Sequence, residues 1–125
     1  MTNLTDVTVT SSLTINGYYI DAPTATVLTA NGTITSANEG VVVLNKATAI
    51  TVTLTNPTAT TDDGKRLHFV SLTDVAHVIN QASGFGKGGA GENVSTFSGV
   101  RGDGLHLIAW QGYWYITGNH QTTVD

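Results

Sequence analysis

The chain has 125 residues, enough for one domain with a modest core. It carries 5 basic and 9 acidic residues, a formal net charge of -4, and no cluster of Lys and Arg, which argues against a nucleic-acid binder. Only 11% of the residues are charged, against roughly 25% in ordinary soluble domains. Thr, Ser, Asn and Gly take their place, so we expect a surface solvated by hydroxyl and amide groups and partly covered in an assembly.

The absence of cysteine excludes disulfides, thiolate chemistry and Cys-ligated zinc. Residues 1–12 have neither a basic start nor a continuous apolar run, so no signal peptide is expected. No apolar run approaches the roughly 20 residues that a membrane helix requires. We therefore expect a protein that folds in a cytoplasm and has no membrane partner.

The dominant sequence period is two, which is the period of a half-buried β-strand. Residues 1–38 are rich in Thr and poor in large apolar side chains, and we interpret them as an N-terminal arm or a pair of outer strands. Residues 39–125 carry the core, and one continuous domain over 1–125 is the alternative. The stretch 41–44 is apolar at every position, as in a strand that is covered on both faces.

Alternation is clearest over residues 50–55, where apolar side chains share one face and three Thr hydroxyls share the other. The core positions predicted in this strand are Ile50, Val52 and Leu54. Further strands are expected over 66–72 and 77–80. No stretch of ten or more residues carries a helical stripe, so any helix should be a single turn.

Turn signals separate the predicted strands: Asn16-Gly17, Asn31-Gly32, Asn56-Pro57, Asp62-Asp63-Gly64 and Gln111-Gly112. Short strands at this regular spacing favour an all-β domain, a small antiparallel sandwich or barrel built of short hairpins. Asp62 and Asp63 carry oxygen atoms that suit calcium, but their spacing matches no EF-hand loop. We interpret them as turn residues.

Residues 84–91, with the sequence GFGKGGAG, contain the glycine spacing of a dinucleotide-binding fingerprint at Gly84, Gly86 and Gly89. That fingerprint requires a helix directly after it and an acidic residue about 20 positions further on. A loop and a strand follow instead, and the residues near the second position indicate a turn. We predict a glycine loop without a nucleotide cofactor.

The four histidines are His68, His77, His106 and His120. No two of them have the local spacing of a metal pair on a strand or a helix, whereas a pair across neighbouring strands stays open. The chain has no G-x-S-x-G nucleophile elbow, and nothing selects a pair of carboxylates for acid–base chemistry. We expect neither a resident metal nor enzymatic activity.

Arg101, Gly102 and Asp103 form the tripeptide that many cell-adhesion ligands present to integrins. Glycines on both sides of Asp103 permit the positive φ angles of a tight corner. With no secretion signal and no disulfide expected, we predict the corner before a strand rather than an adhesion site.

Residues 105–116 are predicted to form a hairpin around the turn Gln111-Gly112, in which Trp110 opposes Tyr113. Because opposed residues share a face, one face is assigned to the core with Leu105, Leu107, Ala109, Trp114 and Ile116. The other face is also apolar and needs a cover. We predict that another copy of the chain covers it, through Ile108, Trp110, Tyr113 and Tyr115. Sugar stacking on the aromatic side chains is the alternative.

The block from residue 39 to about 118 resembles a β-rich domain of structural proteins in tailed bacteriophages. Such domains include head decoration proteins, head fibres and parts of tail fibres. The resemblance lies in the apolar strand with Leu44, the alternating strand ending in Leu54, Asp63-Gly64-Lys65, and the final motif G-L-x-L-I-A-W-x-G-x-W-Y from Gly104. It implies a virion component, often trimeric and without enzymatic activity, and suggests that residues 1–38 contact the capsid.

A chain of this size without a repetitive shaft suits a decoration protein better than a fibre. We therefore expect a homotrimer on the capsid surface that binds the major capsid protein and stabilises the shell. The alternative is a tail-fibre or carbohydrate-binding module that engages a glycan on the host surface.

Overall fold

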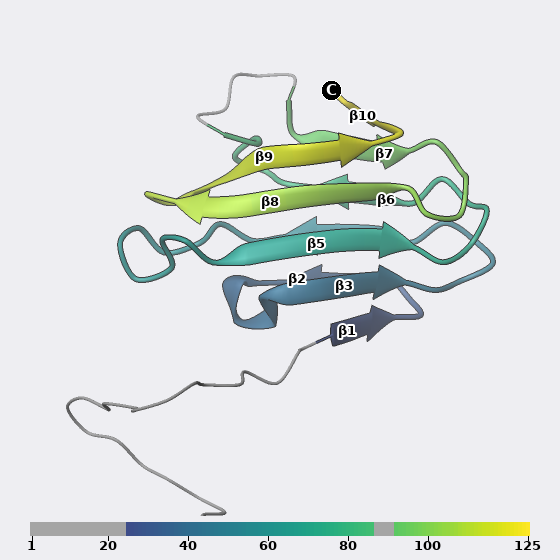
Figure 1. Cartoon of the computed structure of the whole chain (residues 1–125), viewed down its shortest axis with the longest axis horizontal. Coiled ribbons are helices and arrows are strands. Elements are labelled where there is room, and N and C mark those ends of the chain that lie inside the picture. The colour runs from purple at the N-terminus through teal and green to yellow at the C-terminus, as the bar shows by residue number, and fades with distance from the viewer. Residues whose placement is uncertain (1–24, 87–91) are drawn as a thin grey trace, which may run out of the picture.

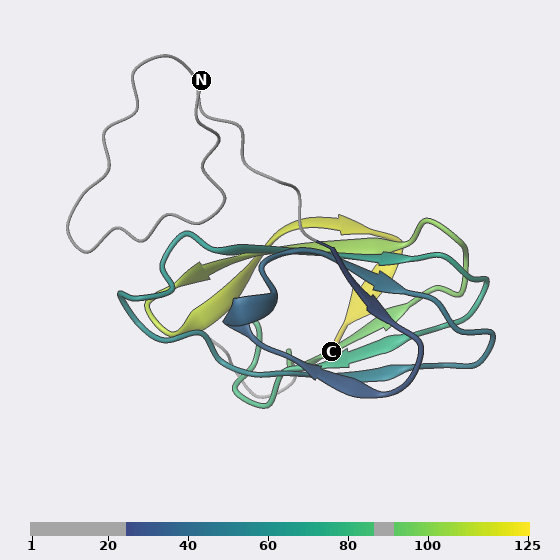
Figure 2. The same ribbon diagram turned by 90° about the horizontal axis from the view of Figure 1, so that it is seen from below.

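The chain forms a β-sandwich of two five-stranded sheets packed face to face, shown from two directions in Figures 1 and 2. The computed structural model describes residues 25–86 and 92–125. Sheet A has the order β1-β3-β5-β8-β9, and sheet B has the order β10-β7-β6-β4-β2. The strands of sheet A are β1 (Ala25–Leu28), β3 (Gly40–Leu44), β5 (Arg66–Ser71), β8 (Gly104–Trp110) and β9 (Tyr113–His120). Those of sheet B are β2 (Gly32–Ile34), β4 (Thr51–Leu54), β6 (Val78–Asn80), β7 (Val94–Phe97) and β10 (Thr122–Val124).

The first six strands alternate between the two sheets, so the chain winds as a flattened coil. Neighbours in each sheet are therefore two elements apart in sequence and run in the same direction: β1, β3 and β5 are parallel, as are β2, β4 and β6. The prediction of an all-β sandwich is confirmed, but its purely antiparallel, hairpin-built form is wrong. Asn31-Gly32, for example, leads from sheet A to sheet B rather than closing a hairpin.

The remaining strands close the sandwich with antiparallel pairs, and the hairpin β8–β9 has the predicted register. Trp110 pairs with Tyr113, Ala109 with Trp114, and Ile108 with Tyr115. Gln111 and Gly112 form the turn with positive φ angles of 46° and 86°, as a two-residue turn of this kind requires. A bulge between His106 and Leu107 then shifts the register toward the other end of the hairpin.

The core lies between the sheets and is made almost entirely of aliphatic and aromatic side chains. Of the seven residues predicted for it, six are buried: Ile50, Val52, Leu54, Leu105, Leu107 and Trp114. Ile116 is half-buried and packs against the same cluster. Trp114 joins the sheets directly, because its indole Nε1–H on β9 donates a 2.8 Å hydrogen bond to the carbonyl of Thr55, just after β4.

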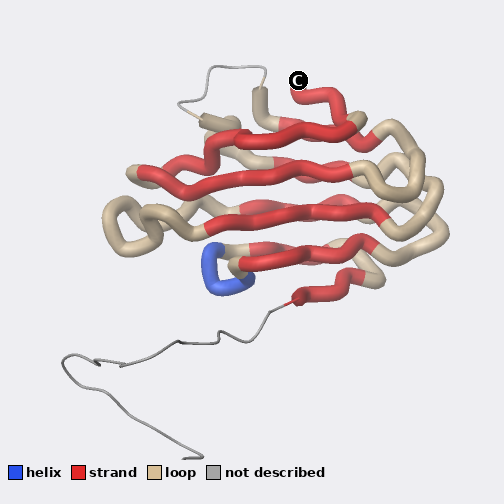
Figure 3. Tube along the Cα trace, viewed as in Figure 1, coloured by secondary structure: helices blue, strands red, loops and turns tan. Residues whose placement is uncertain are grey.

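Helical structure in the described residues is limited to one 3-10 turn, η1 (Ser36–Asn38), drawn in blue in Figure 3. Strands β1 and β2 are the outermost strands of their sheets, and Ile34 of β2 is in the core. Residues 25–38 are thus part of the sandwich. Residues 1–24, to which the expectations of an arm and of a turn at Asn16-Gly17 partly refer, lie outside the described part of the chain.

Candidate functional site

The two outer faces of the sandwich differ in chemistry. Sheet B presents mainly hydroxyl and amide groups to its outside: Thr33, Thr51, Thr53, Asn80, Thr96 and Thr123, together with the half-buried Val78 and Val94. Sheet A presents apolar side chains: Val27, Val41, Val43, Val70, Ile108, Trp110, Tyr113 and Tyr115. We call this second surface the outer face of sheet A. A half-solvated sheet normally alternates apolar and polar positions, so this face is the candidate functional surface.

Strand β3 contributes to this face in a way that corrects its predicted environment. Val42 and Leu44 point into the core and are fully buried, whereas Val41 and Val43 point outward and are half-buried. The strand is therefore covered on one face only within this chain. Its continuous apolar sequence is explained by the second face only if something else covers that face.

The four residues predicted for a subunit interface lie together on the hairpin end of the outer face. Trp110 and Tyr113 oppose each other beside the turn and are 57% and 36% exposed, and Ile108 and Tyr115 form the next, half-buried pair. The structure thus brings these side chains to one surface. Exposed aromatic pairs of this kind are typical of protein interfaces.

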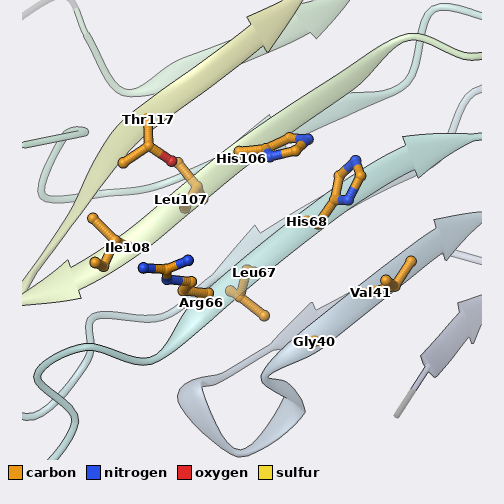
Figure 4. Close-up of a pocket in the computed structure, with 9 residues that line it drawn as sticks. All are labelled: Gly40, Val41, Arg66, Leu67, His68, His106, Leu107, Ile108 and Thr117. Carbon is orange, nitrogen blue, oxygen red and sulfur yellow. The ribbon is translucent and has the colours of Figure 1, made fainter. Parts of the chain in front are cut away.

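A basic pocket lies farther along the same face, where β3, β5, β8 and β9 run side by side (Figure 4). Its volume is about 340 Å³. Arg66, His68, His106 and Thr117 supply its polar groups, and Val41 and Ile108 are among its apolar walls. We call this the basic pocket.

The two histidines of the basic pocket are in register on neighbouring strands, and their ring centroids are 3.7 Å apart. Burial, and then the neighbouring His106 ring, lower the pKa of His68 below its ordinary value of 6.5. Gly118 makes room for the pair, because a Cβ at this position would lie 3.4 Å from His106. The sequence left a cross-strand histidine pair open, and only the pairing of β5 with β8 reveals which two residues form it.

The other two histidines are not part of this pocket. His77 is fully buried and holds loops together: its Nδ1 accepts a hydrogen bond from the Ile50 amide at 3.0 Å, and its Nε2 contacts the Thr73 hydroxyl at 3.0 Å. Because the Thr73 hydroxyl donates to the Lys46 carbonyl, Nε2 must carry the proton. His120 is exposed at the end of β9.

The Arg-Gly-Asp corner does not present its carboxylate to solvent. Asp103 is only 1% exposed, and its Oδ2 accepts hydrogen bonds from the Ser98 hydroxyl at 2.7 Å and from the amides of Gly99 and Val100 at 3.1 Å. The carboxylate therefore organises the turn before β8. This geometry agrees with the predicted corner and removes the group that an adhesion site would need.

The Asp62-Asp63-Gly64 segment is also structural. Asp62 accepts a 2.6 Å hydrogen bond from the Thr58 amide and forms an ion pair with Lys65 at 3.1 Å. The hydrogen bond from Thr58, followed by one from Ser36, lowers the pKa of Asp62 to about 2. Asp63 accepts a 2.6 Å hydrogen bond from the Gln111 amide, so it fastens this turn to the β8–β9 hairpin. No group of three or more potential metal ligands occurs within residues 25–86 and 92–125.

The described part of the glycine loop packs on the hairpin. Phe85 is buried in the core, and the Gly86 amide donates a hydrogen bond to the Trp114 carbonyl. Gly86 has a φ of 68°, and a Cβ there would lie 3.4 Å from Tyr115, which explains the need for glycine. Gly89, the third position of the fingerprint, lies outside the described residues.

Comparison with known proteins adds no assignment. No protein-family model matches the chain, and no curated protein or solved structure matches it. In the described part of the chain, no helix is long and apolar enough to cross a membrane.

Proposed function

We propose that this chain is a structural protein of a tailed-phage virion, a capsid decoration protein without enzymatic activity that assembles as a homotrimer. In this proposal it binds symmetric sites formed by the major capsid protein, on the surface of the capsid, after synthesis in the host cytoplasm. The observation that carries the proposal is the apolar outer face of sheet A, which lies opposite a hydroxyl-rich outer face of sheet B.

The exposed side chains support a protein partner for this face. Trp110 is more than half exposed, and Val27 at the far edge of the same sheet is 56% exposed. Extended apolar surfaces on small soluble proteins commonly mark protein interaction sites. The low charge of the whole chain and the sequence resemblance to phage β-domains support the same class.

The acidic residues support a non-catalytic role. Asp62, Asp63 and Asp103, which lie in the two most distinctive polar motifs, are engaged in turn and loop contacts. Their carboxylates hold the ends of strands rather than facing one another across a cleft. We infer that their role is to fix the loops at both ends of the sandwich.

Sedimentation of matched variants tests the proposed interface. The wild-type chain should sediment as a stable trimer at micromolar concentration, and Trp110→Ala should shift it toward the monomer. Thr53→Ala, which changes an exposed position on the outer face of sheet B, is the control and should leave the trimer intact. A wild-type monomer, or equal effects of the two substitutions, contradicts the interface.

Binding to undecorated capsids then tests the class. Incubation should give saturable, stoichiometric binding. The second candidate function is a carbohydrate-binding module, which the exposed, opposed pair of Trp110 and Tyr113 favours because flat aromatic faces suit sugar stacking. Saturable binding to glycans, with no binding to capsids, selects that function instead.

A further inference from the structure

The basic pocket has a charge environment unlike that of the rest of the chain. The five strands of sheet A contain no Asp or Glu, whereas they contain Arg66 and three of the four histidines. The chain as a whole is acidic, with a net charge of -4. Positive and titratable groups are thus gathered on the one face that lacks a cover.

Arg66 has no carboxylate partner in the described structure. The ion pair found between described residues joins Lys65 to Asp62, and the Arg66 side chain makes none. Its guanidinium group lines the same pocket as both histidine rings and the Thr117 side chain (Figure 4). Planar, multiply donating groups that converge on one space are suited to a carboxylate.

We infer that the protein that covers the outer face of sheet A inserts an Asp or Glu carboxylate into the basic pocket, between Arg66 and the pair of His68 and His106. This inference rests on the proposed function, because it assumes that a protein covers this face. It adds the chemistry of the contact: a carboxylate in a ring of apolar side chains, the arrangement in which a charged hydrogen bond discriminates best between partners.

The surroundings of the pocket favour a protein over an acidic sugar. Its walls are formed largely by aliphatic side chains such as Val41 and Ile108, with Val43 and Val70 on the same face. A saccharide would need several hydrogen-bonding groups for its hydroxyls, and the pocket offers few beyond its charged groups and Thr117. A protein side chain needs only the carboxylate site and an apolar rim, and Arg is enriched in such interfaces.

The inference also predicts a pH dependence. The groups facing the histidine pair from neighbouring strands are Val41 on β3, Gly118 on β9 and Arg66 on β5 itself, so no acidic group of sheet A competes for the pair. A carboxylate in the pocket favours protonated imidazole and should raise the pKa of His68. Carboxylate binding should therefore strengthen as the pH falls below 6.5, whereas metal binding by the same pair would weaken.

Acetate is the probe for the pocket itself. Titration of the full chain with sodium acetate, followed by the imidazole NMR signals, should shift the signals of His68 and His106 saturably and leave that of His77 unchanged. Arg66→Gln should weaken acetate binding about tenfold or more, and the matched control Arg101→Gln should not change it. Shifts that do not saturate, or that survive Arg66→Gln, overturn the pocket.

The protein source is tested by assembly. Arg66→Gln should weaken trimer formation or capsid binding by about tenfold or more, while Arg101→Gln behaves as wild type. If the wild-type chain forms no trimer and binds no capsid, the proposed function fails, and the acetate titration still decides the pocket independently. If glucuronate binds the pocket much more tightly than acetate while Arg66→Gln leaves assembly unchanged, the protein source is wrong.

Discussion

The two tryptophans of the β8–β9 hairpin provide an internal comparison, because they lie one residue pair apart and on opposite faces. Trp114 is fully buried and bonded to the opposite sheet, whereas Trp110 is 57% exposed. Replacing each with Ala removes the same atoms from two different environments. The effects on folding and on assembly should therefore separate.

The cost of Trp114→Ala can be worked from its contacts. Loss of a buried aromatic side chain with its residual cavity costs about 3–5 kcal/mol. Loss of the indole hydrogen bond leaves the Thr55 carbonyl without this donor and adds about 1 kcal/mol. Small domains have total stabilities of about 5–15 kcal/mol, so this variant should be close to unfolding at room temperature.

Trp110→Ala should behave in the opposite way. At an exposed position the change in the free energy of unfolding should stay within about 0.5 kcal/mol, while self-association weakens. Urea unfolding of the dissociated subunit and sedimentation velocity measure the two effects separately. Equal losses of subunit stability in the two variants, or trimers that survive Trp110→Ala, would refute the assignment of the two faces.

Three further predictions concern buried polar groups. Burial lowers the pKa of His77, so its neutral form stabilises the fold fully above pH 6.5, and the free energy of unfolding should fall as the pH drops below that value. The fall should persist in His68→Gln, and a stability that is constant through this range contradicts the assignment. The pKa of Asp62 is lowered from 3.8 to about 2, so its contribution is complete above pH 3.8 and is lost toward pH 2. Asp62→Asn should remove this part of the acid sensitivity in acid-unfolding curves, and curves identical to wild type argue against it. Asp103→Ala should cost about 2–4 kcal/mol because it leaves the buried donors of the preceding turn without their acceptor. Arg101→Ala should cost less than about 0.5 kcal/mol, and comparable losses in thermal unfolding would mean that the carboxylate does not organise the corner.

Strands and faces could be predicted because alternation is a local property. The register Ala109 opposite Trp114 follows from a two-residue turn and the period of two, and it places one tryptophan inside and the other outside. The burial of Ile50, Val52 and Leu54 follows in the same way. Each of these inferences needs only residues that are near in sequence.

The pairing partners could not be predicted, because alternation does not encode strand direction. Asn31-Gly32 and Asp62-Asp63-Gly64 have the composition of tight turns, yet each lies in a connection between the two sheets. The parallel pairs of β3 with β1 and β5 follow from that winding. The basic pocket was hidden for the same reason, since Arg66 and His106 are 40 positions apart and meet only through the pairing of β5 with β8.

Sedimentation velocity of the wild-type chain at micromolar concentration tests the central claim most directly. The apolar outer face of sheet A, with Trp110 and Tyr113 at its end, requires a cover, and we expect another copy of the chain to provide it. The proposal predicts a single boundary at the mass of a trimer of the 13.0 kDa chain. A single boundary at the mass of the monomer would contradict it.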